Sequence, residues 1–343
     1  MFAPDPRANP ILLGHETAER ALLDAIRQGR MHHALLITGP EGIGKATLAY
    51  RFGRRLLAGE QLRTDPRGDS LALDPAHPVF RRVMAGGHAD MLTVERAFDE
   101  KSKRYKRDIA VDDVRRINGF MALTPAEGGW RVAIVDGAED LNQASANALL
   151  KILEEPPARA VLILVCSAPG RLLPTIRSRC RRLRLPPLPD PVMARLLKDY
   201  APELSQDDRD RLVTLAEGSI GRALTVAADD GIAVAALVDN LLAALPNVPL
   251  SRGHEVADAL GRNENGFHLF TAQLIAGIAA LVRDTVRGRA DPEQQRLVAL
   301  RPLEAWGELW QGLLRVQDET ERFALDKRQA FVSCVAMLTG KMT

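Results

Sequence analysis

Short apolar runs alternate with amphipathic segments through the first half of the chain. The runs Ala34–Ile37, Arg131–Val135 and Ala160–Val165 are mostly aliphatic, as expected of strands buried on both faces of a parallel sheet. The segments Glu16–Ile26 and Leu48–Leu56 carry apolar residues at helical spacing. This alternation predicts a doubly wound α/β sheet.

Helix-capping and helix-breaking residues refine the predicted boundaries of these elements. Asp112 and Asn142 precede helical patterns, so both are predicted N-caps, and Pro156 ends the second of these helices. The segment Gly59–Ile109 is irregular and rich in Pro, Gly and Asp, which predicts a surface insertion. Within it, the basic stretch Asp99–Asp108 is typical of a hairpin.

A proline-rich linker, Leu185–Pro191, separates this region from the rest of the chain. All later apolar patterns are helical, which predicts a bundle. We therefore expect three domains: a nucleotide-binding-like domain over 1–186, a helical lid over 187–235, and an all-α domain over 236–343. The apolar faces expected in the last of these contain Phe267, Phe270, Leu274, Ile278 and Leu281; Trp306, Leu309, Leu313 and Val316; and Phe331, Val335 and Leu338.

Composition excludes several classes of protein. The net charge of the 343 residues is only +2, so nucleic acid contacts must come from local patches. The three cysteines lack C-x-x-C spacing, so neither a disulfide framework nor a zinc site is expected, and we expect no metal site. The start of the chain has no leader-like pattern, and the apolar runs are short for a membrane span. A cytoplasmic protein without a membrane partner is expected.

A glycine-rich loop carries the clearest chemistry. Gly39, Gly42, Gly44 and Lys45 fit the pattern G-x-x-x-x-G-K, which lies between a predicted strand and a predicted helix. In this context the backbone N–H groups wrap phosphate, and the lysine reaches the β and γ phosphates. The sequence therefore predicts a P-loop.

The loop lacks side chains that ATP hydrolysis requires. The next position is Ala46 instead of the Ser or Thr that ligates Mg²⁺, and Thr47 points about 100° away on a helix. Asp136, at a strand end, fits the Walker B aspartate that holds Mg²⁺, but Gly137 follows it in place of the usual Glu. We interpret Glu139 as a solvated turn residue, while an inward orientation would let it orient water. Hydrolysis at this site is therefore doubtful.

Two basic features allow more than one interpretation. Arg222 follows a Gly-Ser-Ile-Gly segment between two helices, where it either folds over a nucleotide or decorates its own helix. The other feature is a basic run that is either a solvated face or the source of an arginine finger for a neighbouring subunit. This run contains Arg177, Arg179, Arg181, Arg182 and Arg184.

Three segments together resemble a known family. They are GPEGIGKAT from Gly39, ALLKILEEPP from Ala148, and RLLPTIRSRC from Arg171. In this order they resemble the AAA+ subunits of the bacterial replicative clamp loader, most closely the delta-prime family of DNA polymerase III, from about Pro10 to Leu185. The resemblance implies an α/β P-loop NTPase with a RecA-like parallel sheet, then a small helical lid and an all-α C-terminal collar.

The resemblance also implies roles for single residues. Arg179 corresponds to the arginine finger offered to an adjacent subunit's ATP, Ser167 lies near the sensor-1 position, and Arg222 lies near sensor 2. Many relatives carry a four-cysteine zinc module after the P-loop helix, whereas Gly59–Ile109 contains no cysteine. Zinc is therefore not expected.

The function expected from the resemblance is a non-hydrolysing subunit of the DNA polymerase III holoenzyme, holding ATP or ADP without turnover. Its partners would be the tau/gamma ATPase subunits and the delta subunit and, through the complex, the sliding clamp and primer-template DNA. The alternative is an active AAA+ ATPase, either tau/gamma-like or another DNA-remodelling enzyme, rescued by Thr47 and Glu139. A small-molecule P-loop kinase ranks last, because the helical C-terminal half suggests no acceptor pocket.

Overall fold

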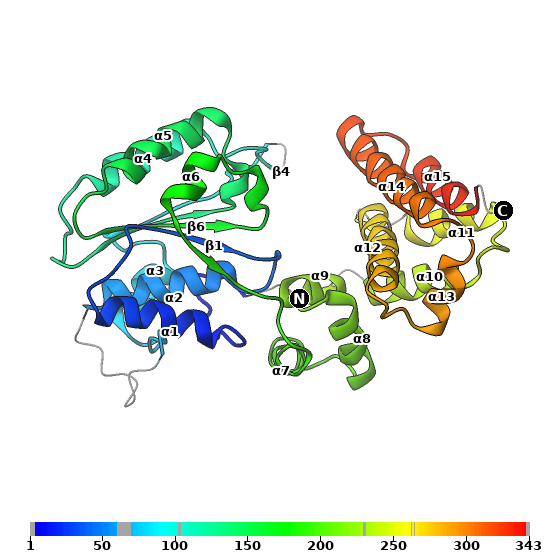
Figure 1. Ribbon diagram of the computed structural model, residues 1–343, viewed down its shortest axis with the longest axis horizontal. Helices are drawn as coiled ribbons and strands as arrows, with labels where there is room; N and C mark the ends of the chain where they lie inside the picture. The colour runs from blue at the N-terminus through cyan, green and yellow to red at the C-terminus, as the bar shows by residue number, and fades with distance from the viewer. Residues whose placement is uncertain are drawn as a thin grey trace. The chain divides into compact units, whose positions relative to one another are not determined.

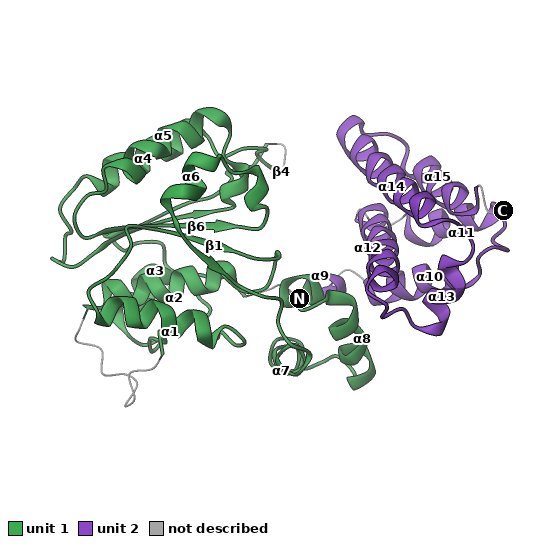
Figure 2. Cartoon of the chain, viewed as in Figure 1, with its two compact units in different colours: residues 1–224 green, residues 225–343 purple. Residues whose placement is uncertain are grey.

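The chain folds into two units, Met1–Leu224 and Thr225–Thr343 (Figure 2). The computed structural model describes residues 4–59, 70–101, 104–228, 231–261, 263 and 265–340. A parallel sheet with the strand order β2-β5-β6-β1-β7 organises unit 1 (Figure 1). Its strands are β1 (Ala34–Thr38), β2 (Met91–Val94), β5 (Arg131–Asp136), β6 (Ala160–Cys166) and β7 (Arg181–Arg184).

Helices cover both faces of this sheet (Figure 1). Alternate residues of β1 enter opposite cores: Leu35 and Ile37 pack with the first three helices, and Ala34 and Leu36 pack with the next three. This arrangement confirms the predicted α/β class. The helices of the first face are α1 (Glu16–Arg27), α2 (Lys45–Leu57) and α3 (Pro78–Met84), and those of the second are α4 (Val111–Met121), α5 (Gln143–Glu154) and α6 (Pro174–Arg179).

The insertion after α2 contains more structure than its sequence predicts. It includes α3 and β2, a short edge strand with a single buried residue, which leaves almost no apolar periodicity to detect. The expected hairpin is present as β3 (Phe98–Asp99) paired antiparallel with β4 (Arg104–Tyr105), while residues 102 and 103 lie outside the described part. Residues 60–69 of the segment without cysteines also lie outside it.

The predicted caps have different outcomes. The Asn142 side chain accepts from the N–H of Ser145, so its capping role is confirmed. The prediction for Asp112 is wrong: α4 begins earlier, with Ala110 as its N-cap, and Asp112 lies in the first turn. There its charge favours the helix through the dipole without a capping bond. Part of the basic run, Arg181–Arg184, forms the exposed edge strand β7, which agrees with the interpretation of these residues as a solvated face.

Three helices after the linker complete unit 1, namely α7 (Asp190–Tyr200), α8 (Gln206–Ala216) and the start of α9 (Ile220–Ala228). Residues 187–224, which the sequence assigns to a lid, therefore cluster with the sheet. The three-domain division at 186 and 235 stays a prediction.

The regular elements among the described residues of unit 2 are all helices, as predicted. Its core holds Phe267, Phe270 and Phe331 in aromatic contact, with Trp306 fully buried beside them. By length and composition alone, helix α12 (Gly266–Val286) is apolar enough to cross a membrane, yet its apolar face packs into this core. The helices are α10 (Gly231–Ala243), α11 (Ser251–Leu260), α12 (Gly266–Val286), α13 (Pro292–Val298), α14 (Leu303–Phe323) and α15 (Lys327–Thr339).

Candidate nucleotide site

The carboxyl ends of the central strands meet at one edge of the sheet, where the predicted site residues follow them. Thr38 of β1 pairs with Cys166 of β6, and Asp136 of β5 pairs with Val165. This edge is where α/β sheets bind ligands, and it holds a cavity of about 670 Å³. The predicted residues that line the cavity are Gly42, Gly44, Lys45, Thr47, Asp136 and Ser167.

The loop between β1 and α2 has the backbone of a phosphate cradle. Gly42 and Gly44 have φ angles of 73° and 102°, in the left-handed region that favours glycine. Helix α2 begins at Lys45 with no acidic residue in its first turn, so its N-terminal dipole faces the cavity without a carboxylate partner on that turn. The loop therefore fits an anionic ligand.

Lys45 links this loop to the end of β6. Its Nζ donates to the carbonyl of Pro40 at 2.6 Å and to Oγ of Ser167 at 2.8 Å. Only 6% of the residue is exposed, and burial lowers its pKa, against the opposing charges of Glu139, Glu41 and Asp136. The lysine therefore lies between the P-loop and the position predicted for sensor 1.

Glu139 corrects our interpretation of the turn after β5. It lies in the short helical turn η2 (Ala138–Asp140), lines the cavity, and accepts the N–H of Ser167 at 2.8 Å through Oε1. Its Oε2 is buried without a hydrogen-bond partner among the described residues. Glycine at position 137, with φ of 78°, lets the chain turn inward here. Glu139 is therefore a residue of the site, and its assignment as a solvated residue is wrong.

Asp136 lies in the same cavity with a raised pKa. Burial is the main cause, Glu95 adds to it, and Lys45 opposes it, so that the pKa rises from 3.8 to about 6. Near neutral pH, the folded chain therefore holds an ionised carboxylate at an energetic cost. A cation held in the cavity would reduce this cost.

Replacing Asp136 by Asn is expected to stabilise the ligand-free chain at about pH 7, by about 1–2 kcal/mol. The folded-state pKa is raised, so protonation stabilises the fold fully below the unfolded value of 3.8, and this stability is lost as the pH rises through about 6. The advantage of Asp136→Asn should therefore shrink as the pH falls from about 6 to about 4. Thermal unfolding across this range checks it, and an advantage independent of pH would contradict it.

The position next to Lys45 offers the cavity no ligand for a metal. Ala46 lines the cavity with a methyl group only, while the buried Thr47 also reaches it. Asp136 and Glu139 also line the cavity and supply carboxylates to it. The described residues contain no group of three or more His, Cys, Asp or Glu placed to hold a metal ion.

The N-terminus of α9 packs directly onto the P-loop. The N–H of Gly221 donates to the carbonyl of Gly42 at 2.9 Å, and Oγ of Ser219 donates to the carbonyl of Glu41 at 2.7 Å. A Cβ added at Gly221 would lie 2.8 Å from Cα of Gly42, which is too close for this packing. The backbone contact therefore requires glycine at position 221.

Substituting Gly221→Ala is expected to lower stability by about 1–3 kcal/mol, because backbone atoms must move apart. The matched control is Gly119→Ala in α4, where nothing lies within 4 Å of an added Cβ and helix propensity predicts a gain of about 1 kcal/mol. Chemical denaturation measures both variants. Equal or greater stability of Gly221→Ala relative to Gly119→Ala would contradict the contact.

Three predicted residues lie outside the cavity lining. Gly39 lies against the main chain of Leu185, where an added Cβ would lie 2.5 Å from the carbonyl oxygen. Arg222 is half-buried, and its main-chain N–H donates to Ser219. Arg179 lies at the end of α6, where its guanidinium pairs with Glu154 at 3.0 Å. The roles predicted for these residues stay predictions.

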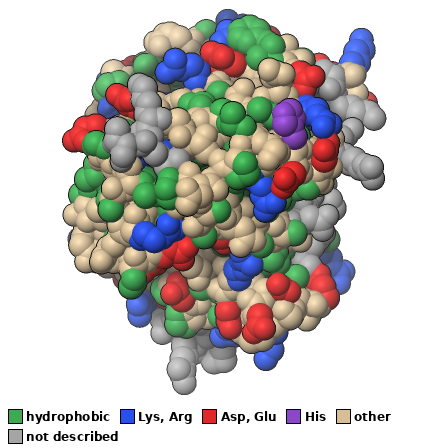
Figure 3. Space-filling model, turned by 90° about the vertical axis from the view of Figure 1, so that its right-hand side faces the viewer, with side chains coloured by type: hydrophobic (Ala, Val, Ile, Leu, Met, Phe, Trp, Pro, Cys, Tyr) green, Lys and Arg blue, Asp and Glu red, His purple; other side chains and the backbone are tan. Residues whose placement is uncertain are grey.

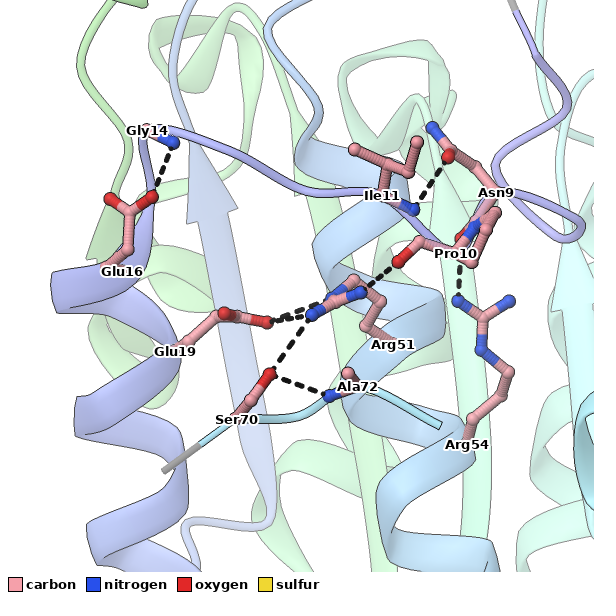
Figure 4. Close-up of polar contacts among 10 residues, drawn as sticks. All are labelled: Asn9, Pro10, Ile11, Gly14, Glu16, Glu19, Arg51, Arg54, Ser70 and Ala72. Atoms are coloured by element: carbon pink, nitrogen blue, oxygen red, sulfur yellow. Dashed lines mark hydrogen bonds and ion pairs between the residues drawn. The ribbon is translucent and has the colours of Figure 1, made fainter. Parts of the chain in front are cut away.

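An N-terminal strap, residues 4–13, forms another wall of the cavity and is tied to α2 (Figure 4). Arg54 donates to the carbonyls of Arg7 at 2.7 Å and Asn9 at 2.9 Å, and Arg51 donates to the carbonyl of Pro10. Asn9 in turn shares hydrogen bonds with the hydroxyl of Tyr200 in α7. The strap thus joins the P-loop helix to the helices after the linker.

The two α2 arginines that bind the strap, Arg51 and Arg54, differ in how their charges are matched. Arg51 donates from Nε and Nη2 to Oε1 of Glu19 in α1, both at 2.9 Å, with both side chains almost fully buried (Figure 4). Arg54 lies 4.2 Å from the ring centroid of Phe80 and has no carboxylate partner among the described residues. Burial, with a contribution from Arg51, lowers its pKa to about 10.

These residues were not predicted from the sequence. The available signal was local: Arg51 and Arg54 lie among the apolar residues Leu48, Phe52 and Leu56 of the P-loop helix. Asn9 and Tyr200 carried no such signal, because their contact joins positions 191 residues apart.

Comparison with known proteins places this site in a family. The family described as "DNA polymerase III, delta subunit" matches residues 14–189. A DNA polymerase III subunit delta' of Pseudomonas aeruginosa is 37% identical over 192 residues, covering 54% of this chain and 53% of that protein. A subunit gamma/tau of Mycobacterium bovis is 32% identical over 189 residues, 54% of this chain and 30% of that protein.

The chain spans about half the length of the delta' relative that it matches. A solved structure of a DNA polymerase III gamma-subunit-related protein from Thermotoga maritima is 22% identical with a TM-score of 0.45, over 95% of this chain and all of that one. The family match covers half of the chain, including the P-loop, Asp136 and Ser167. The chain therefore belongs to the DNA polymerase III delta-subunit family of AAA+ clamp-loader proteins.

Proposed function

We propose that the chain is a delta-prime-type subunit of the clamp loader, which holds ATP or ADP without turnover and supplies an arginine finger to a neighbouring ATPase. Its partners are the tau/gamma ATPase subunits and the delta subunit. Through the complex it acts on the sliding clamp and primer-template DNA in the cytoplasm. The similarity to delta' and gamma/tau subunits supports this assignment to the complex.

One observation carries the proposal: the residue after Lys45, inside the cavity, is Ala46. The remaining residues fit a nucleotide, since the loop amides, the N-terminus of α2 and Lys45 would hold its phosphates. The phosphates of a bound nucleotide would place negative charge next to Lys45 in the cavity. Without a hydroxyl at position 46, Mg²⁺ would depend on Asp136 and water, so hydrolysis is disfavoured.

The position of Arg179 supports a role in trans. It lies outside its own chain's cavity and is about one third exposed, held by Glu154 of the LEEPP segment at 3.0 Å. An ion pair this exposed is worth about 0–1 kcal/mol, so the guanidinium can leave Glu154 for a neighbour's phosphate at little cost. Two of the three segments that carry the family resemblance, those containing Glu154 and Arg179, therefore meet at this ion pair.

We assign the lid to residues 187–235 and the collar, which assembles the ring, to 236–343. Helix α14 offers the collar a docking face, because Leu303, Trp310 and Leu314 share one side of it and are each 36–37% exposed. We expect collar helices of neighbouring clamp-loader subunits to cover this stripe.

The alternative, an active ATPase, is favoured by the inward position of Glu139. The test is Mg²⁺-dependent ATP turnover by the isolated full-length chain, compared with its Glu139→Gln variant. The proposal predicts turnover at the level of the Lys45→Ala variant and no effect of Glu139→Gln. Turnover well above that level, lost in Glu139→Gln, would establish the alternative.

A further inference from the structure

The hairpin β3–β4 exposes a pair of aromatic side chains. Phe98 and Tyr105 are cross-strand partners, with ring centroids 5.2 Å apart in an edge arrangement. Phe98 is 52% exposed and Tyr105 is 64% exposed. Large aromatic groups with this exposure do not stabilise a core, and the mutual contact holds them side by side in solvent.

Basic residues are concentrated in the sequence around this aromatic pair. The stretch Arg96–Asp108 has six Lys or Arg residues against three Asp or Glu residues, in a chain whose net charge is only +2. The side chains of Lys103 and Arg104 lie outside the described part of the structure. Lys101, Lys106 and Arg107 are exposed, and the guanidinium of Arg96 lies 5.9 Å from the Tyr105 ring centroid. By contrast, the face in Figure 3 mixes both charges with hydrophobic side chains between them. The hairpin is therefore a local cationic and aromatic surface.

The base of the hairpin is fixed to the nucleotide cavity. Arg96 pairs with Asp140 at 3.1 Å, in the same turn η2 that carries Glu139, and the N–H of Lys106 donates to the carbonyl of Ala97 at 2.8 Å. Arg96, Tyr105 and Asp140 also line the cavity, whereas Phe98 does not. The aromatic pair thus lies on a β-hairpin whose base is fixed, which reduces the conformational entropy lost when a ligand binds.

We propose that this hairpin binds single-stranded nucleic acid, with unpaired bases stacking on Phe98 and Tyr105 and phosphates contacting Lys101, Lys106 and Arg107. Exposed ring faces beside cations suit unpaired bases, because bases in a duplex are already stacked on one another. An acidic protein segment would satisfy the cations but would leave the aromatic faces unused. This inference rests on the proposed function, in which the single strand is the template of primed DNA.

The test is fluorescence anisotropy of a labelled oligothymidine with the full-length chain at low salt. Phe98→Ala and Tyr105→Ala are each expected to weaken binding about five- to tenfold, the lower part of the range for base stacking. Lys106→Gln with Arg107→Gln should reduce the slope of log affinity against log salt by about 1.4 in magnitude, as for two phosphate contacts on a single strand.

Matched controls separate stacking from charge and from folding. Phe323→Ala removes a ring that is 62% exposed and lies 5.4 Å from the guanidinium of Arg322 in unit 2, and it should leave binding unchanged. An abasic strand of equal length should bind less tightly and be insensitive to Phe98→Ala. Because Phe98 lies outside the cavity lining, its substitution should not alter ATP affinity.

Three results would overturn the inference: no measurable binding of the oligothymidine, equal effects of Phe98→Ala on the normal and abasic strands, or tighter binding to a polyglutamate peptide than to the strand. The last would assign the hairpin to an acidic protein partner. The proposed function fails separately, through ATP turnover by the isolated chain. Hairpin variants that lose strand binding yet still assemble with the ATPase subunits would support both.

Discussion

In a clamp loader assembled around this chain, Arg179→Ala is expected to slow ATP hydrolysis at the adjacent ATPase subunit by about a thousandfold. An arginine finger stabilises charge that develops on the γ phosphate, so its removal affects the chemical step more than nucleotide binding. A factor of this size corresponds to about 4 kcal/mol of transition-state stabilisation. In a single-turnover experiment, the rapid phase of ATP hydrolysis that arises from the adjacent subunit's site should disappear.

The matched control for this prediction is Arg177→Ala. Arg177 lies on the same short helix, α6, and is exposed, so its removal takes away the same charge from the same surface. Arg179→Lys should not restore the rate, because an ammonium group lacks the planar fork of the guanidinium. If Arg177→Ala and Arg179→Ala slow hydrolysis equally, the effect comes from surface charge and the finger assignment fails.

Arg51→Ala is expected to cost about 3–5 kcal/mol of folding stability, because it leaves the Glu19 carboxylate buried without its partner. It also releases the carbonyl of Pro10 and so loosens the strap over the cavity. The control on the same helix is Arg55→Ala, which removes a half-buried arginine bonded to the carbonyl of Gly59. Urea denaturation should show a loss below about 1 kcal/mol for this control.

A double-mutant cycle separates the charge from the packing. The cycle compares Glu19→Leu, Arg51→Leu and the variant with both changes. The double variant removes both charges and should be more stable than Arg51→Leu alone, since no unpaired ion remains in the core. If the double variant loses as much stability as the sum of the single variants, the ion pair does not explain the cost.

Much of unit 1 follows from sequence because its strands are buried on both faces. The apolar runs Ala34–Ile37 and Ala160–Val165 lie where the pattern predicts, and the P-loop fixes the ligand edge of the sheet. The edge strands β2 and β7 were not predicted, because an edge strand such as Arg181–Arg184 faces solvent and its sequence shows no apolar periodicity.

The site was predicted less completely than the fold, for physical reasons. Lys45, Asp136 and Ser167 follow strands and are therefore located by topology. Glu139 depends on the left-handed turn at Gly137, and the strap depends on contacts between Arg54 and carbonyls more than forty residues away. Local pattern does not locate the partners in either arrangement.

The most direct test of the account compares two variants of this chain in the same reconstituted complex with the tau/gamma and delta subunits. A non-hydrolysing arginine donor predicts that Lys45→Ala leaves DNA-stimulated ATP hydrolysis nearly unchanged, whereas Arg179→Ala removes the contribution of the adjacent site. The opposite result, a loss with Lys45→Ala and none with Arg179→Ala, would show that the chain hydrolyses ATP in its own cavity and would contradict the account.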